Sequence, residues 1–560
     1  MLRSIRILPH HKVDISKMKN TNANIRIVGF TLAVILGMVG LGFVPPFKMF
    51  GMEFESVDIL SELRAEDSME EAMEDYTANF ELLEQELAIA EAHINDTEVN
   101  ADPIPVRYEW VVERAAKERH QKLRSKDMMP ALQQYVDFED FDTLATTRFD
   151  NFIAKLAEGK SVRIAFMGDS FVEGDIVTCD LRDELQRRFG GRGAGFIHSD
   201  IPFSTVRKTI KRTSSNWKTY SVMKAKEAPE AIRERLFISG YIAEGGAGAT
   251  TRWQSVGAYP TLDSCSRARI LLISRDTSHV EVLLGDSLRK EFTIAGDERV
   301  REIYVEGYVD DIRLRVVKGS IICYGASLEG NGGVTVDNFS VRSNNGHAIF
   351  GTSATVNRQI DELLGYDLVV LQYGLNIMQQ GQRGYSKYRD QVRDMIAYAE
   401  RCFPNAAILV MGVSDRWVKN AETNAYEPIG SVDALTSYQR AAADSCNVVF
   451  WETARVMQNL GGMPAFVSNG WAAKDYTHIN YAGGKRIATA LTDAICYRVF
   501  THLFEREEAA RIEAERQAEL ERQRELEAKE LLESQINAVA PLIDSIGWDN
   551  EANNRDNCEE

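Results

Sequence analysis

Four apolar runs alternate with helical stretches in this chain, and this alternation limits the folds that it can adopt. The runs cover residues 162–167, 368–373, 407–411 and 447–451. Apart from Arg163, Gln372 and Asn447 they are apolar rather than alternating, as expected for buried strands of a parallel sheet. The pattern predicts an α/β domain with a parallel sheet.

A different pattern separates the first apolar run from the other three. Between about Ile201 and Val336, short alternating runs follow one another at roughly ten-residue spacing with turn residues between them, which is typical of a β-sandwich. We therefore predict one α/β domain in two pieces, residues 135–200 and 337–502, interrupted by a β-sandwich at residues 201–336. The two pieces together have the length of one ordinary domain.

The N-terminal part has the character of a membrane segment. No charged residue occurs from Ile27 to Phe47, and about twenty such residues suit one helical crossing of the bilayer. Upstream basic residues outnumber a single acid, Asp14, so residues 1–26 are expected in the cytoplasm and the rest outside it. An uncleaved anchor is favoured over a cleaved signal peptide, because the run is long and no small-x-small site precedes Pro45-Pro46.

Helical segments are expected on both sides of the α/β domain. Residues 48–134 are interpreted as a helical stalk, with self-association through it as the weaker alternative. An amphipathic helix from Tyr135 to Leu156 is expected to lead into the first strand. Residues 503–560 are predicted to form a solvated charged helix, supported by pairs such as Glu507 and Arg511, followed by a polar tail.

Charge and cysteine content exclude some classes of function. The net charge of −18 disfavours nucleic acid as a partner. Seven cysteines occur without Cys-x-x-Cys pairs, which argues against a zinc site and against a dense disulfide framework. Free thiols are the favoured interpretation, while a single Cys265–Cys323 bridge stays open.

The first apolar run leads directly into Gly168-Asp169-Ser170. A serine at this position is exposed at the carboxyl end of a strand, and the strand-to-helix junction offers free backbone N–H groups to a negatively charged oxygen. Asp169 is interpreted as the N-cap of the following helix. A second copy of the tripeptide, Gly285-Asp286-Ser287, falls between two predicted β-strands and is interpreted as a hairpin turn.

His478 is the strongest candidate for a base that could activate Ser170. It alone among nine histidines follows a carboxylate, Asp475, by three residues in a loop that enters a helix. Asp475 can accept the Nδ1 proton and leave Nε2 free for the serine. His198 and His347 remain as alternatives.

A third motif, Gly374-Leu375-Asn376, follows the apolar run 368–373. This is the end of a strand at which α/β sheets bind ligands. The Asn376 side chain could donate a hydrogen bond to an oxyanion there, and Gly374 would let the backbone approach closely. Taken alone, the motif is better explained as a turn that ends a strand.

Four motifs together resemble the SGNH (GDSL-type) hydrolases in their order and spacing. They are Gly168-Asp169-Ser170, a glycine at 346, Gly374-x-Asn376 and Asp475-x-x-His478. The resemblance covers about residues 155–200 and 335–500. It implies a flavodoxin-like three-layer α/β/α fold without a metal or other cofactor.

The same resemblance assigns a role to each motif. It implies that Ser170 is the nucleophile, His478 the base and Asp475 the residue that orients it. The implied oxyanion hole consists of the Ser170 N–H, the Gly346 N–H and the Asn376 amide. In the stretch from Val341 to Gly346, relatives often carry glycine at the position of Ser343.

One branch of the family is more similar than the others. The phrase Gly168–Asp175, followed by Phe189-Gly190-Gly191-Arg192-Gly193, resembles the peptidoglycan O-acetylesterases, in which a carbohydrate-binding-like β-sandwich follows the first βα unit. This implies removal of O-acetyl groups from a cell-envelope polysaccharide at the periplasmic side of a bacterial inner membrane. The expected partners are that glycan, the membrane through one helix, and envelope acylation or glycan-assembly proteins.

Two other functions stay open. The same triad could act as an O-acetyltransferase if a donor protein supplied the acyl group. Alternatively, the chain could bind glycans through the insert while its hydrolase domain is silent. For that alternative, four aromatic residues of the insert could stack on sugars or could instead pack in the core: Trp217, Tyr241, Trp253 and Tyr259.

Overall fold

The structure, a computed structural model, describes residues 47–49, 52–54, 136–144, 146–202, 207–263, 265–285 and 288–545. The predicted cytoplasmic segment 1–26, the predicted transmembrane segment 27–47 except its last residue, and most of the predicted stalk 48–134 lie outside these residues. At the start of the stalk, β1 (Phe47–Met49) and β2 (Met52–Phe54) pair antiparallel. None of the described helices is both long enough and apolar enough to span a bilayer.

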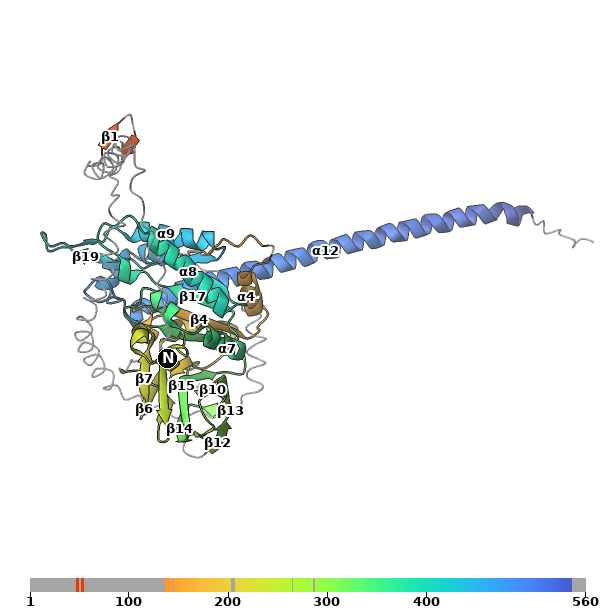
Figure 1. Cartoon of the computed structure of the whole chain (residues 1–560). Helices are drawn as coiled ribbons and strands as arrows, with labels where there is room; N and C mark the ends of the chain where they lie inside the picture. Colours follow the sequence, from red (N-terminus) through yellow and green to blue (C-terminus); the bar gives the residue numbers. More distant parts are fainter. Residues whose placement is uncertain are drawn as a thin grey trace, which may run out of the picture.

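A six-stranded sheet forms the centre of the α/β domain (Figure 1). Its first five strands are mutually parallel, and β3 pairs antiparallel at one edge. Numbered along the chain, the parallel strands lie in the order 2-1-3-4-5, which is the flavodoxin-like order. In spatial order the strands are β16 (Val334–Ser340), β4 (Val162–Gly168), β17 (Leu368–Gln372), β18 (Ala407–Met411), β21 (Val449–Trp451) and β3 (Glu139–Asp140).

Helices cover both faces of this sheet, as predicted. In β4, Ile164 and Phe166 point to one apolar layer, while Ala165 and Met167 point to the other, because successive strand side chains face opposite ways. The first layer contains α4 (Arg148–Ala157), α5 (Thr178–Phe189), α10 (Thr453–Asn459), α11 (Gly462–Ser468) and the start of α12 (Tyr481–Ser545). The second contains α7 (Ala354–Leu364), α8 (Ser386–Cys402) and α9 (Val432–Ser445).

The helix that leads into the first strand is shorter than predicted. It begins at Arg148 rather than at Tyr135. Thr147 and Asp150 form a reciprocal capping box, in which each side chain accepts the backbone N–H of the other residue, and this arrangement fixes a helix start. Upstream, residues 139–140 pair with β21 as an edge strand, and the neighbouring Phe138 is buried without belonging to a helix.

The insert consists of two facing antiparallel sheets (Figure 1). One has the order β13-β10-β15-β8-β7, with β5 pairing to β15, and the other the order β12-β11-β14-β9-β6. The strands are β5 (Gly195–His198), β6 (Ile210–Ser215), β7 (Lys218–Ser221), β8 (Tyr241–Gly246), β9 (Thr250–Ser255), β10 (Cys265–Ser274), β11 (Ser278–Leu284), β12 (Leu288–Ile294), β13 (Val300–Val309), β14 (Asp311–Lys318) and β15 (Ser320–Glu329). The turn at Gly285 joins β11 to β12, so this copy of the Gly-Asp-Ser motif belongs to a hairpin.

One sheet of the insert is buried on both faces. In β10, Ile270 and Leu272 belong to the core between the two sheets, whereas Leu271 and Ile273 belong to the core shared with helices of the α/β domain. The insert is therefore packed against the α/β domain through an apolar layer of its own rather than joined to it only by the chain.

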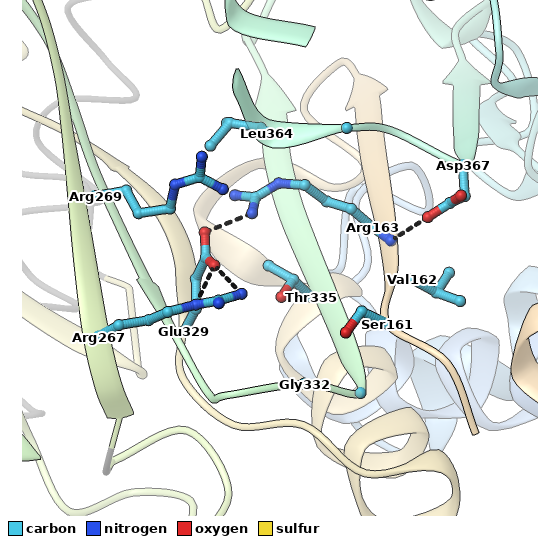
Figure 2. Close-up of a pocket in the computed structure, with 12 residues that line it drawn as sticks. Ser161, Val162, Arg163, Arg267, Arg269, Glu329, Gly332, Thr335, Leu364 and Asp367 are labelled. Carbon is cyan, nitrogen blue, oxygen red and sulfur yellow. Dashed lines mark hydrogen bonds and ion pairs between the residues drawn. The ribbon is translucent and has the colours of Figure 1, made fainter. Parts of the chain in front are cut away.

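A polar junction completes this contact (Figure 2). The buried Arg163 of β4 donates to Glu329 at 2.5 Å and to Asp337 at 2.7 Å, and Arg267 of the insert reaches the same Glu329 at 2.9 Å. A cavity of about 70 Å³ lies beside them. Because Arg163, Arg267 and the neighbouring Arg269 all pair with carboxylates, we assign the cavity to the junction rather than to a ligand.

The last helix, α12, is a single element of 65 residues. Its first part packs on the α/β domain with buried residues such as Ile487 and Leu491, but from Phe504 onward nearly all of its described side chains are exposed. The predicted charged helix is thus continuous with the helix that follows His478, and it extends away from the body as a rod (Figure 1). At 1.5 Å per residue the exposed part is about 60 Å long.

Candidate active site

Ser170 lies at the carboxyl edge of the central sheet, directly after β4. The preceding Gly168 has no room for a side chain, because an added Cβ would lie 2.4 Å from Val172 and 2.9 Å from Gln372. Ser170 is half-buried, and its Oγ has no hydrogen-bond partner among the described residues. The hydroxyl is therefore not committed to a structural contact.

Asp169 does not cap the helix that follows, so that prediction is wrong. Helix α5 begins only at Thr178, and its N-cap residue is Val177. Asp169 is instead fully buried, and its Oδ1 accepts the Phe171 N–H at 2.9 Å. Burial raises the pKa of Asp169 to about 7, although the N–H groups of Phe171 and Leu375 and the charge of His478 all lower it. Near neutral pH, a large fraction of this carboxyl is uncharged beside the serine.

The raised pKa predicts a pH-dependent loss of stability. An unfolded aspartate titrates near 3.9, so protonated Asp169 stabilises the fold fully below that pH, and the contribution is lost as pH rises through about 7. Between pH 5 and pH 8, we expect the free energy of unfolding of the wild type to fall by about 3 kcal/mol relative to Asp169→Asn. Urea denaturation of both proteins at the two pH values measures this, and parallel pH dependences would contradict it.

Asp475 and His478 form the predicted pair on one tight turn. The Nδ1 atom of His478 lies 2.7 Å from Asp475 Oδ2, and Asp475 Oδ1 accepts the backbone N–H groups of Thr477 and His478 at 2.9 and 3.1 Å. Burial alone would raise the pKa of Asp475, but the hydrogen bond and charge of His478 outweigh it, so the pKa is lowered. An ionised Asp475 holds the proton on Nδ1 and leaves Nε2 free.

The turn that carries His478 lies against the loop that carries Ser170. The charge of His478 acts on the carboxyl of Asp169, the neighbour of the serine. Three residues after His478, the Tyr481 hydroxyl donates to the Gly174 carbonyl at 2.6 Å. The fold thus brings the predicted nucleophile and base, which are about three hundred residues apart in sequence, to the same edge of the sheet.

A short hairpin that was not predicted from the sequence contacts the turn that carries Asp475 and His478. It consists of β19 (Trp417–Lys419) and β20 (Tyr426–Pro428). The Tyr426 ring stacks on Tyr476 with centroids 3.9 Å apart, and the Trp417 N–H donates to the Tyr476 carbonyl at 3.1 Å. Tyr476 has a left-handed φ of 55°, which these contacts hold in place. In the sequence, this hairpin is indicated by two aromatic residues that flank the polar stretch 420–424.

Asn376 and Gly374 lie where the sequence placed them, immediately after β17. Gly374 has a φ of 124°, which favours glycine, and Asn376 lies in a short 3₁₀ helix, Leu375–Ile377. The Asn376 Nδ2 donates to the Asn344 carbonyl at 3.1 Å. This hydrogen bond fixes the orientation of the Asn376 side-chain amide.

The predicted role of Gly346 does not agree with its contacts. Its N–H donates to the side chain of Asn344 at 2.9 Å. Gly346 also packs tightly, because an added Cβ would lie 2.2 Å from Met395 Sδ. The structure therefore engages this N–H within its own loop rather than presenting it to a substrate.

Three residues next to Gly346 organise this part of the site, and the sequence analysis did not assign roles to them. Asn344 is buried and contacts both Gly346 and Asn376. Ser343 has a left-handed φ of 59°. Arg342 donates to the buried Glu173 at 2.6 Å, which ties this loop to the nucleophile loop. In the sequence, this turn is indicated by the Asn-x-Gly spacing, which is typical of a turn closed by an asparagine side chain.

The aromatic residues of the insert are mainly structural. Trp253 is completely buried and Tyr241 nearly so. The Trp217 indole N–H donates to the Thr250 carbonyl at 2.8 Å, and the Tyr259 hydroxyl donates to Asp180 of α5 at 3.4 Å. These contacts favour core and interface packing over a sugar-stacking surface.

The other candidate groups are also structural. His198 is enclosed, and burial lowers its pKa to about 3, so it is not a competing base. Cys265 and Cys323 are free thiols, as are the other cysteines of the described residues. Within the part of the chain that the structure describes, no cluster of three metal-ligating side chains occurs.

Similarity to known proteins is found in the structure and not in the sequence. No family profile matches the chain, and no curated protein matches it by sequence. The solved structure "Peptidoglycan O-acetylesterase in action, 5 min" superposes with a TM-score of 0.54 at 19% identity, covering 65% of this chain and 99% of that chain. The chain thus has a flavodoxin-like α/β fold with a β-sandwich insert. In particular, it shares this fold with a peptidoglycan O-acetylesterase.

Two further matches overlap much less. A family two carbohydrate esterase from Cellvibrio japonicus has a TM-score of 0.22 at 10% identity, with 52% of this chain and 99% of that chain covered. A putative GDSL-like lipase from Parabacteroides merdae has a TM-score of 0.21 at 16% identity, with 29% and 73% covered. Neither TM-score is high enough to support a conclusion about this chain.

Proposed function

We propose that this chain is a serine esterase that hydrolyses O-acetyl groups of a cell-envelope polysaccharide through an acyl-Ser170 intermediate. One observation carries the proposal: the Asp475–His478 pair meets the Ser170 loop at the carboxyl edge of the sheet. A shared fold with a peptidoglycan O-acetylesterase supports the substrate class.

The contacts support a two-step reaction. Nε2 of His478 takes the proton of Ser170 as its Oγ attacks the acetyl carbonyl, while Asp475 stabilises the charged ring. The tetrahedral intermediate collapses, His478 returns the proton to the sugar oxygen, and the sugar hydroxyl leaves. A water molecule then attacks the acetyl-serine, again losing its proton to His478, and acetate is released as Ser170 is restored.

We propose that three groups donate hydrogen bonds to the negative oxygen of each intermediate, namely the Ser170 N–H, the Asn376 side-chain amide and the Ser343 N–H. Ser343 takes the place predicted for Gly346, whose N–H is engaged by Asn344. An uncharged Asp169 directly below the serine avoids repulsion of the developing negative charge.

We further propose that residues 27–47 anchor the protein in a bacterial inner membrane with the hydrolase domain in the periplasm. The uncharged run and the basic residues before it support this topology. It would place the site beside the envelope glycan and beside envelope acylation or glycan-assembly proteins as partners.

Acetate release tests the proposal. We expect the purified protein to liberate acetate from O-acetylated peptidoglycan and from p-nitrophenyl acetate, without an added metal. Mass spectrometry of the glycan should show loss of acetyl groups. Gain of acetyl groups by a glycan in the presence of an acyl donor, without release of acetate, would instead identify a transferase. If the glycan neither loses nor gains acetyl groups, both functions are contradicted.

A further inference from the structure

The loop after Ser170 contains a buried carboxylate that the reaction above does not use. Asp175 is 0% exposed. Both it and the preceding Gly174 have left-handed backbones, with φ of 69° and 66°. For a residue other than glycine this conformation costs about 1 kcal/mol or more, so the surroundings of Asp175 must hold it there.

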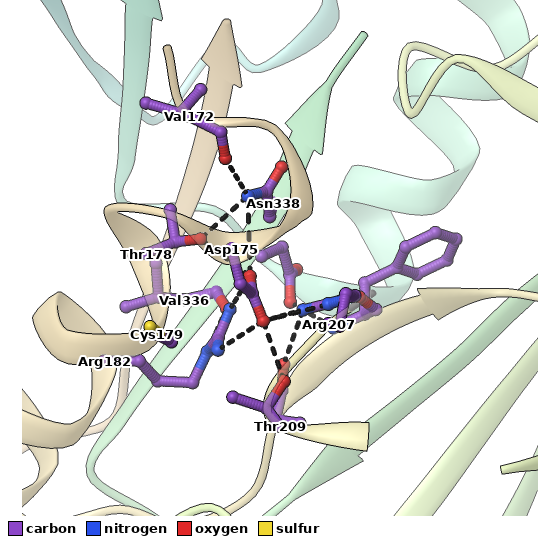
Figure 3. Close-up of polar contacts among 12 residues, drawn as sticks. Val172, Asp175, Thr178, Cys179, Arg182, Arg207, Thr209, Val336 and Asn338 are labelled. Carbon is purple, nitrogen blue, oxygen red and sulfur yellow. Dashed lines mark hydrogen bonds and ion pairs between the residues drawn. The ribbon is translucent and has the colours of Figure 1, made fainter. Parts of the chain in front are cut away.

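Five side chains donate to this carboxylate, one of them being Asn338 of β16 at 3.4 Å (Figure 3). From α5, Thr178 donates at 2.7 Å and Arg182 at 3.3 Å. From the segment that leads into β6, Arg207 donates at 2.9 Å and Thr209 at 2.8 Å. Burial alone would raise the pKa of Asp175, but the charges of the two arginines outweigh it and lower the pKa. The carboxylate is thus ionised between two cations.

Arg207 and Thr209 belong to the entry of the β-sandwich and not to the α/β domain. Arg207 is also fixed at its other end, because its Nη1 donates to the Phe196 carbonyl of β5 at 2.9 Å. Thr209 is completely buried. The insert therefore reaches beneath the nucleophile loop through two side chains whose positions are fixed.

The same loop is tied to other parts of the site. Asn338 of β16 donates to the Val172 carbonyl at 2.8 Å and to the Thr178 hydroxyl at 2.7 Å. Tyr481, just after the catalytic turn, donates to the Gly174 carbonyl at 2.6 Å. A shift of Asp175 would therefore move the loop between Ser170 and Thr178, and with it the approach of His478.

From these contacts we infer that Asp175 is a positioning residue, and that Arg207 and Thr209 of the insert set the alignment of Ser170 through it. The β-sandwich is then part of the support of the active site and not only an attached module. The inference rests on the proposed esterase function, which supplies its kinetic readout.

Two matched threonine variants test it. Thr209→Val removes the hydroxyl that contacts Asp175, whereas Thr261→Val removes a hydroxyl of the same insert that contacts Asp183 of α5, away from the nucleophile loop. On p-nitrophenyl acetate we expect kcat to fall about 10-fold for Thr209→Val and to stay within twofold for Thr261→Val, with KM little changed in both. Misplacement of a reacting group by about 1 Å can cost on the order of 100-fold.

Arg207 provides a stronger perturbation with a conservative partner. We expect kcat to fall about 100-fold for Arg207→Met and to recover partly for Arg207→Lys, which keeps the charge but not the fork of donors. Thermal unfolding must show each variant folded at the assay temperature. Unchanged kcat for folded Thr209→Val and Arg207→Met would overturn the inference.

Amide hydrogen exchange separates this inference from the proposed function. We expect residues 170–178 to exchange faster in Thr209→Val than in the wild type, and not in Thr261→Val. This difference in exchange is expected even if the protein hydrolyses no ester. An inactive wild type would therefore contradict the proposed function but not the positioning role of Asp175. Equal exchange in all three proteins would remove the positioning role.

Discussion

Replacing Ser170 with alanine is expected to reduce hydrolysis of p-nitrophenyl acetate by about 10⁴-fold or more, because no other group can form the acyl-enzyme. The hydroxyl has no hydrogen-bond partner among the described residues, so its removal leaves no structural contact unsatisfied. The Tm should therefore stay close to that of the wild type. Steady-state kinetics and thermal unfolding measure the two quantities.

The chain contains its own control for this variant. Ser287 belongs to the second Gly-Asp-Ser copy, between β11 and β12 of the insert. Ser287→Ala should retain full activity, whereas mass spectrometry after exposure to a slowly hydrolysed ester should find the acyl group on Ser170 alone. Full activity of folded Ser170→Ala would remove this serine from the mechanism.

The second large effect is expected at the base and its partner. His478→Ala should lower kcat by about 10⁴-fold or more, because the serine would lose its proton acceptor. Asp475→Asn should cost about 10²- to 10⁴-fold, since an asparagine amide that donates toward Nδ1 favours the wrong tautomer of the ring. Stopped assays at high enzyme concentration measure both.

The hairpin that holds the turn offers a graded comparison. Tyr426 stacks on Tyr476. Among the described residues, no hydrogen bond joins Tyr426 to the imidazole of His478. Tyr426→Leu should therefore cost far less than Asp475→Asn. Equal losses in the two variants would mean that the carboxylate acts by shaping the turn and not by orienting the ring.

Much of the fold could be predicted because its signals are local. The central strands are mostly apolar runs, and strands of the insert such as β14 alternate, so a parallel sheet with an inserted sandwich could be inferred. The helix begins at Arg148 and not at the predicted Tyr135, because apolar residues in this stretch suit either state. The pairing of Glu139 and Asp140 with β21 is a tertiary contact that helical periodicity does not reveal.

The candidate site divides in the same way. Ser170, Asp475 and His478 occur in short motifs whose geometry follows from a strand end and a tight turn. The loop from Val341 to Gly346 was harder, because its backbone donors depend on which N–H the Asn344 side chain engages. The Asp175 cluster was not visible at all, since Arg207 and Thr209 lie more than thirty residues from Asp175 and look like ordinary polar loop residues.

The continuity of α12 has a practical consequence for experiments. Its exposed part begins after Phe504, more than twenty residues beyond His478. A fluorescent label or affinity handle joined beyond Ser545 would be held about 60 Å from the body. Such a fusion can serve for surface immobilisation or energy-transfer distance measurement with the handle held away from the body.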